Sequence, residues 1–149
     1  MTIVGSISDQ TLAGVITTAT HGAGLHFGVI STRVMSLTLL LADGSRQTCS
    51  REENSGLFMA SLCGLGTTGI ILRVQLQVEP AFRLKEINRN LCFPDVVMKL
   101  DEHVQKSEHG VFWWYPATDM IRVSYCNRTN EASSFLLFFC FSLSYHQYG

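Results

Sequence analysis

The chain has 149 residues and a mass of 16.6 kDa, which predicts about one domain with a substantial core. Eleven Lys and Arg residues stand against twelve Asp and Glu residues, and the formal net charge is −1. The sequence has no long run of like charges, so we expect no nucleic-acid partner. Charged residues make up only 15% and hydrophobic residues 46%. An average soluble domain has about 25% charged residues, so this composition excludes a disordered chain.

The cysteines and the apolar stretches exclude further classes of protein. Five cysteines are scattered along the chain without a CxxC pair. This spacing predicts neither a disulfide framework nor a zinc site, so we expect free thiols and no bound metal. No stretch approaches the roughly 18 consecutive apolar residues of a membrane-spanning helix, and we expect no signal peptide at the start.

The first predicted element is a short helix over residues 9–18, with Ser8 as its N-cap. Gly14 and several β-branched residues lower its helix propensity, so this helix requires packing against the rest of the fold. Small residues at 21–24 then predict a loop. Residues 33–50 alternate or run apolar up to Leu41, reach the Asp43-Gly44 pair and resume with Gln47 and Thr48, which predicts a hairpin of two antiparallel strands.

The next predicted elements are a helix and a strand. Ser50 and Glu53 have the spacing of a capping box, which predicts a helix over 53–63. A glycine-rich stretch at 64–69 follows this helix. Residues 70–79 are rich in β-branched types and predict a strand that the following proline ends. We expect this strand to share a sheet with the first strand of the hairpin.

One longer helix and two strands are predicted in the second half of the chain. A proline at a first helical position opens a helix over 94–109, with apolar residues at helical spacing and charges opposite them. We expect His103 and His109 on its solvated face. Strands are predicted at 111–115 and 120–126, joined by a proline-containing turn.

The composition changes twice along the chain. A shift near residue 80 is the candidate domain boundary. Residues 132–149 contain no charged side chain, and their apolar part is too short to cross a bilayer as a helix. Two explanations of this tail stay open: an interfacial membrane anchor, and a sequence that was not selected for this fold.

Residues 64–69, Gly-Leu-Gly-Thr-Thr-Gly, match the GxGxxG pattern of dinucleotide-binding Rossmann turns. That turn needs a strand before the glycines and a helix after them, so that the pyrophosphate meets the helix N-terminus. Here the predicted order is inverted, and we do not expect a Rossmann site. The glycines either close a tight helix-to-strand turn or let backbone amides approach a ligand.

Residues 18–24, Thr-Ala-Thr-His-Gly-Ala-Gly, form a second candidate site. A neutral backbone rich in donors suits an anionic pyrophosphate where Lys and Arg are scarce. The alternative is a buried glycine turn with a hydrogen-bonded core histidine. The sequence contains no nucleophile elbow, HExxH helix or paired metal ligands.

Several blocks of this sequence together resemble the sugar-1,4-lactone oxidases: GSISDQTLAGVITTATHGAG, LADGS, SREENSGLFMASLCGLGTTGIILRVQLQVEP and FWWYPATD. These fungal D-arabinono-1,4-lactone oxidases and animal L-gulonolactone oxidases are vanillyl-alcohol-oxidase-type FAD flavoproteins, and the resemblance covers residues 4–131. It implies an α+β fold: the second subdomain of the FAD-binding domain, followed by the start of the cap domain. On this assignment, 1–80 belong to the FAD-binding domain, 81–131 start the substrate or cap domain, and 132–149 form an atypical apolar tail.

The resemblance also implies a set of cofactor-binding residues. They lie near the FAD diphosphate or ribityl group, along the flavin side and beside the adenosine end, and they are Ser6, Ser8, Gln10, Thr11, Gly14, Thr18, His21, Gly22, Gly24, Gly66, Gly69 and Ile70. The family commonly has glycine where this sequence has Ala19, so we expect the added methyl group to crowd the cofactor. The family's flavin-linking histidine motif, its HWGK-like segment and its lactone-holding residues are not found here, so the catalytic residues are unknown.

The resemblance implies an FAD-dependent oxidase of the aldono-1,4-lactone type, present as a fragment. Its reaction converts D-arabinono-1,4-lactone and O₂ into dehydro-D-arabinono-1,4-lactone and H₂O₂, a step of ascorbate-type biosynthesis. The implied partners are a small sugar lactone and molecular oxygen, with peripheral association with the mitochondrial or endoplasmic reticulum membrane. Two alternatives stay open: a non-catalytic truncated remnant, and a module that binds a membrane or a partner through the apolar tail.

Overall fold

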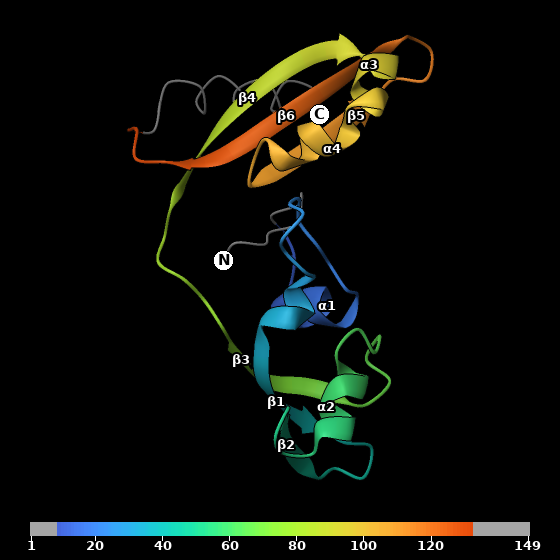
Figure 1. Ribbon diagram of the computed structural model, residues 1–149. Coiled ribbons are helices and arrows are strands. Elements are labelled where there is room, and N and C mark those ends of the chain that lie inside the picture. Colours follow the sequence, from blue (N-terminus) through green and yellow to red (C-terminus); the bar gives the residue numbers. More distant parts are fainter. Residues whose placement is uncertain (1–8, 133–149) are drawn as a thin grey trace, which may run out of the picture.

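The computed structural model describes residues 9–132, and Figure 1 shows two antiparallel sheets, each accompanied by short helices. In chain order the elements are α1 (Leu12–Thr17), the 3₁₀ helix η1 (Ile30–Arg33), β1 (Val34–Leu40), β2 (Arg46–Ser50), α2 (Ser55–Ser61), β3 (Ile70–Leu76), β4 (Arg83–Cys92), α3 (Phe93–Met98), α4 (Leu100–Gln105), β5 (His109–Trp114) and β6 (Met120–Thr129). The predictions for residues 1–8 and 133–149, which include most of the apolar tail, concern residues outside the described part of the chain.

The first sheet has the strand order β2-β1-β3. Both neighbours pair with β1 in the antiparallel sense, so the expected hairpin and the expected sharing of one sheet by 33–41 and 70–79 are confirmed. Leu37 and Leu39 of β1 point to one face, where Ile16 of α1 and Phe58 of α2 pack on them. These four side chains are essentially inaccessible to solvent. Burying each contributes roughly 1.5–3 kcal/mol, which explains how a weak helix such as α1 is retained.

Helix α1 is shorter than predicted because it begins at a different cap. The hydroxyl oxygen of Thr11, not Ser8, accepts the Gly14 amide at 3.2 Å, and helical residues run only from Leu12. At the other end, the Thr18 hydroxyl donates to the Gly14 carbonyl at 2.8 Å. Threonine hydroxyls compete with helical backbone bonds in this way, so α1 ends after six residues.

The predicted capping box does not start a helix. The Ser50 hydroxyl oxygen accepts the Glu53 amide at 3.0 Å as expected, but the Ser50 amide donates to the Glu53 carbonyl at 2.7 Å rather than to its carboxylate. The segment therefore closes into a turn. Asn54 follows with a left-handed φ of 50°, and α2 begins only at Ser55.

The second sheet has the strand order β4-β6-β5. Strand β4, as long as β6 at ten residues, was not predicted, because its polar side chains are exposed along almost its whole length and leave no clean alternation. It nevertheless pairs with β6 from Arg83 to Cys92. The core of this half consists of Val96, Ile121 and Val123, against which aromatic residues of β5 and β6 pack.

The helix expected over 94–109 is wrong in its extent. It divides into α3 and α4 at Lys99, whose φ of −122° is not helical, and it ends at Gln105. The expectation that His109 lies on a solvated helix face is also wrong, because His109 opens β5 and is buried. His103 does lie on α4, where its Nδ1 bonds the Tyr125 hydroxyl.

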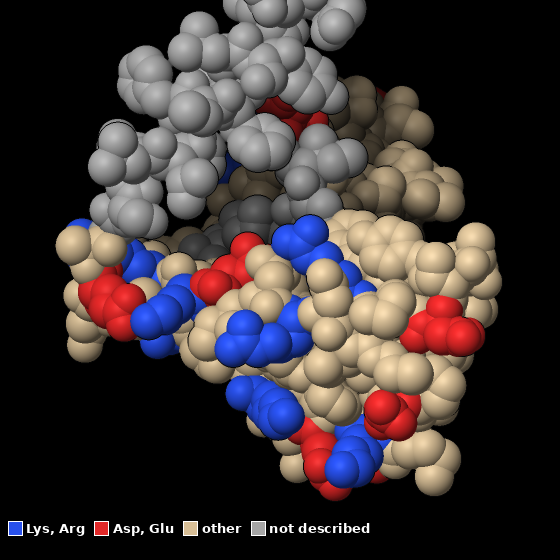
Figure 2. Space-filling model, turned by 90° about the horizontal axis from the view of Figure 1, so that it is seen from above, with Lys and Arg blue, Asp and Glu red and all other residues tan. Residues whose placement is uncertain are grey.

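The two sheets are joined by residues 77–82, near the predicted domain boundary, and the loop after α1 extends toward β5 (Figure 1). The division into domains itself stays a prediction. On the face seen in Figure 2, the described acidic and basic side chains are interspersed and form no continuous basic surface. None of the described helices is long and apolar enough to cross a membrane.

Candidate functional site

Two glycine-bearing bends lie side by side at the end of α1. We call residues 18–24 the first bend and residues 64–69 the second bend. The Cys63 amide donates to the Ile16 carbonyl and the Leu65 amide donates to the Thr17 carbonyl, each at 3.1 Å. The chain leaving α2 is thus bonded to the last turn of α1. These two bonds attach the start of the second bend to the helical turn directly before the first bend.

Most of the positive-φ residues of the described chain lie in or next to the two bends. Apart from Gly44 and Asn54, every described residue with positive φ lies in or next to them: Ala19, Gly24, Cys63, Leu65, Gly66 and Gly69. Alternation of right-handed and left-handed residues turns successive backbone amides toward one side and creates concave anion-binding surfaces. The bends therefore have the backbone geometry that recognition of a phosphate group requires.

The hydroxyl groups of the bends hold the backbone rather than face outward. Thr18 donates to the Gly14 carbonyl and Thr67 donates to the Gly64 carbonyl, both at 2.8 Å. The Thr68 hydroxyl bonds the Ser61 hydroxyl at 2.8 Å. Residues 9–32 contain no Lys or Arg. An anion at this site would consequently be bound mainly by backbone amides.

The predicted glycines differ in what lies beside them. A side chain at Gly69 would meet the Leu40 carbonyl of β1 at 2.5 Å, and one at Gly24 would meet the Glu108 carbonyl at 2.6 Å. At Gly14 the nearest atom is the Thr11 hydroxyl oxygen, at 2.8 Å. Beside Gly66 nothing lies within 4 Å. Of these four glycines, only Gly66 faces open space that a bound group can occupy.

The other predicted binding residues lie around the bends. Ser6 and Ser8 fall outside the described residues, and Gln10 is exposed ahead of α1. His21 is exposed, and its Nδ1 lies 3.0 Å from the carbonyl of Gly22. Ile70 opens β3 with 65% of its surface exposed, and Leu65 in the second bend is 74% exposed. Each of these side chains offers apolar surface that is suited to contact an apolar ring. The assignment of this set to a cofactor stays a prediction.

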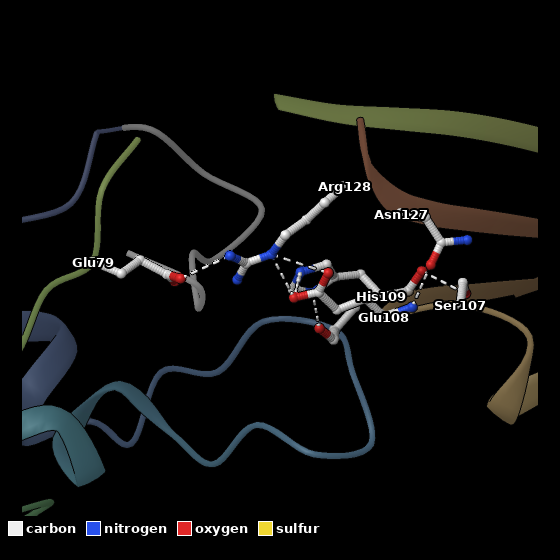
Figure 3. Close-up of polar contacts among 7 residues, drawn as sticks. Glu79, Ser107, Glu108, His109, Asn127 and Arg128 are labelled. Carbon is white, nitrogen blue, oxygen red and sulfur yellow. Dashed lines mark hydrogen bonds and ion pairs between the residues drawn. The ribbon is translucent and has the colours of Figure 1, made fainter. Parts of the chain in front are cut away.

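The sequence analysis missed a polar cluster that joins the first bend to the second sheet (Figure 3). His109 Nδ1 lies 2.6 Å from the Ala23 carbonyl. Arg128 donates to Glu108 at 2.9 Å and forms an ion pair with Glu79 at 2.9 Å. The only available signal was alternation from His109 into β5, which the helical spacing of the preceding residues obscured.

The charge of Arg128 is strongly fixed by this cluster. The hydrogen bond from the guanidinium to Glu79 has the largest effect and the one to Glu108 the next largest. Both raise the pKa of Arg128 above its already high ordinary value. The guanidinium also lies 4.1 Å above the Phe82 ring. Arg128 therefore links the segment between the sheets to the start of β5 as a permanent cation.

Known proteins match most of this chain. L-gulonolactone oxidase of Scyliorhinus torazame is 38% identical over 128 residues, which cover 86% of this chain and 29% of that protein. D-arabinono-1,4-lactone oxidase of Yarrowia lipolytica is 39% identical over 113 residues, or 76% of this chain and 22% of that protein. The model of the D-arabinono-1,4-lactone oxidase family matches residues 74–139 of this chain. The chain is thus similar to sugar-1,4-lactone oxidases over most of its own length.

These matches confirm the resemblance to sugar-1,4-lactone oxidases seen in the sequence. The chain spans less than a third of the length of these curated relatives. Cholesterol oxidase of Brevibacterium sterolicum has a similar structure, with a TM-score of 0.76 at 18% identity over 89% of this chain and 28% of that one. This likeness confirms the expected α+β fold, that of part of a vanillyl-alcohol-oxidase-type domain.

Proposed function

We propose that this chain is the FAD-binding portion, with the start of the cap, of an FAD-dependent aldono-1,4-lactone oxidase. The observation that carries the proposal is the attachment of the second bend to the last turn of α1, next to the first bend, through the Cys63 and Leu65 amides, with open space beside Gly66. The similar proteins supply the reaction class, because they are named D-arabinono-1,4-lactone oxidase and L-gulonolactone oxidase.

The residues present fit the diphosphate and adenosine end of FAD. The backbone at Gly66 is left-handed, and nothing lies within 4 Å of the position that a side chain would take there, so a phosphate group can approach this backbone closely. The exposed Ile70 and Leu65 side chains offer an apolar surface to the adenosine end. When bound, FAD supplies the acceptor for the hydride that leaves the lactone. The role of the bends is to bind and orient the dinucleotide.

The proposed substrates are an aldono-1,4-lactone and molecular oxygen. The lactone loses two hydrogens, and O₂ takes them up as H₂O₂. We assign this activity to a protein in which these residues are joined to the further segments that the relatives contain, because the chain matches 29% or less of the relatives compared above. No residue of this chain is assigned a catalytic role.

A titration of the purified chain with FAD tests the proposal. We expect quenching of flavin fluorescence that saturates, and competition by ADP, because ADP carries the adenosine diphosphate end without the flavin. The affinity should be weak, since a partial site leaves most of the dinucleotide free. Lack of any FAD or ADP binding at millimolar concentration would overturn the proposal for this chain and favour a non-catalytic remnant.

We further propose peripheral association with the mitochondrial or endoplasmic reticulum membrane, supported by the family resemblance and by the uncharged apolar tail. Flotation with vesicles is the test. Binding to vesicles that is lost when residues 132–149 are deleted supports an anchor in the tail. Flotation that is absent, or unaffected by this deletion, contradicts it.

A further inference from the structure

The start of β5 lies against the first bend and makes several close contacts with it. His109 Nδ1 lies 2.6 Å from the Ala23 carbonyl oxygen, and the His109 ring stacks on Phe27 with 4.9 Å between centroids. The neighbouring Glu108 carbonyl lies 2.6 Å from the position that a side chain at Gly24 would take. Glu108 and His109, at the start of β5, thus contact the loop after α1 at three positions. These positions are Ala23, Gly24 and Phe27.

The contact with Ala23 sets the protonation of the His109 ring. A carbonyl oxygen only accepts, so Nδ1 must carry the hydrogen. The other ring nitrogen, Nε2, is buried without a hydrogen-bond partner among the described residues, and His109 as a whole is 8% exposed. A buried polar ring with one unsatisfied nitrogen costs free energy, so a role in solubility or simple packing does not explain this residue. The one hydrogen bond of the ring within the described residues is with the bend, and Nε2 lies 4.0 Å from a Glu108 carboxylate oxygen.

The segment that carries His109 is itself held from several sides. Arg128 donates to both Glu108 carboxylate oxygens, at 2.9 and 3.1 Å, and the Glu108 amide donates to the Asn127 side chain at 2.8 Å. The Ser107 hydroxyl donates to the His109 carbonyl at 2.9 Å. These bonds, drawn in Figure 3, hold the strand end that carries the imidazole. A rigidly supported donor is what a residue that orients a flexible loop needs.

We propose that His109 is a positioning residue for the first bend. Its Nδ1 hydrogen bond to Ala23 and its stacking on Phe27 hold Gly22 and Gly24 in the conformation in which the bend receives the dinucleotide. The link to the dinucleotide rests on the proposed function. The ordering of the bend by His109 does not, and it can be tested without any ligand.

Amide exchange in the full 149-residue chain tests this ordering. His109→Leu removes the donor at similar size, whereas His109→Asn keeps a donor near the position of Nδ1. His103→Leu is the matched control, because His103 bonds Tyr125 within the second sheet and does not touch the bend. The reporter is the Phe27 amide, which donates to the Gly24 carbonyl at 3.3 Å and closes the bend.

We expect exchange of the Phe27 amide to accelerate about tenfold or more in His109→Leu, because the Ala23 carbonyl loses its partner. The Leu37 and Val123 amides in the two sheets should keep their rates, and His109→Asn should restore most of the protection. The proposal is overturned if Phe27 exchange is unchanged in His109→Leu. It is also overturned if His103→Leu has the same effect, or if all three amides accelerate together and asparagine does not rescue them.

The same variants titrated with FAD separate the two proposals. If the wild-type chain binds FAD, His109→Leu should weaken binding about tenfold and His109→Asn should restore it. Unaltered FAD affinity in His109→Leu, with a loosened bend, contradicts the link to the dinucleotide. If the wild-type chain binds no FAD, the proposed function fails, while the exchange rates still decide whether His109 orders the bend.

Discussion

At the scale of single residues, Ala19 is explained by the backbone rather than by the cofactor. The sequence suggested that its methyl group crowds a bound flavin, because related sequences have glycine there. The structure gives Ala19 a φ of 55°, a left-handed conformation that costs an L-residue roughly 1–2 kcal/mol. Glycine adopts this conformation without strain, so the family preference follows from the turn itself.

Ala19→Gly should therefore stabilise the chain. Relief of strain exceeds the extra entropy that glycine gains in the unfolded state, so we expect the free energy of unfolding to rise by about 0.5–1 kcal/mol. Urea denaturation measures this change. The control is Ala60→Gly in the exposed part of α2, which should lower stability by about 1 kcal/mol. A loss of stability in Ala19→Gly would contradict the backbone explanation.

Gly66 and Gly69 should respond unequally to substitution, although the sequence pattern treats them alike. Alanine at either position is strained, because φ is +78° and +144°. Only at Gly69 does the new methyl group also collide with the Leu40 carbonyl. We expect Gly69→Ala to cost more than about 3 kcal/mol and Gly66→Ala about 1–2 kcal/mol in thermal unfolding. Equal losses would show that β1 does not approach Gly69 this closely.

At the scale of elements, apolar alternation predicted the strands of the first sheet well, because each has one buried face. The same reasoning failed for β4, whose side chains are exposed on both faces, and its pairing with β6 is visible only in three dimensions. Helix boundaries were set by local hydroxyl bonds and by the break at Lys99, which propensity does not encode. In the site, glycines marked both bends, whereas the alternation that begins at the buried His109 was obscured by the helical spacing of the residues before it.

Strand β2 contributes a buried thiol whose ionisation affects stability. Burial raises the pKa of Cys49 above its ordinary value. The folded chain therefore keeps this proton at a pH where the unfolded chain loses it. The contribution to stability is complete below the unfolded pKa of about 9 and falls as pH rises through the folded value. We expect the free energy of unfolding to fall less steeply between pH 8 and 10 in Cys49→Ala than in the wild type. An identical slope would contradict burial of this thiol.

At the scale of the whole molecule, Arg128 connects the segment 77–82 to the second sheet. Arg128 and its partners are partly exposed, so its removal should change global stability little. It also covers the Phe82 ring. We expect Arg128→Gln to accelerate chymotrypsin cleavage after Phe82 several-fold. Lys85→Gln, which breaks the exposed pair with Glu131, should leave this cleavage rate unchanged. Equal rates in both variants and the wild type would mean that Arg128 does not secure the connection.

The central claim is that the second bend receives a dinucleotide beside Gly66, and a matched pair of glycines tests it most directly. Gly44 and Gly66 have similar φ values, +82° and +78°, and nothing lies within 4 Å of either on the side-chain side. Alanine should therefore destabilise the fold equally at both positions. Only Gly66 lies in one of the two bends. Measured by FAD fluorescence titration, Gly66→Ala should weaken binding at least tenfold and Gly44→Ala should bind like the wild type. Equal FAD affinity in the two variants would contradict the account.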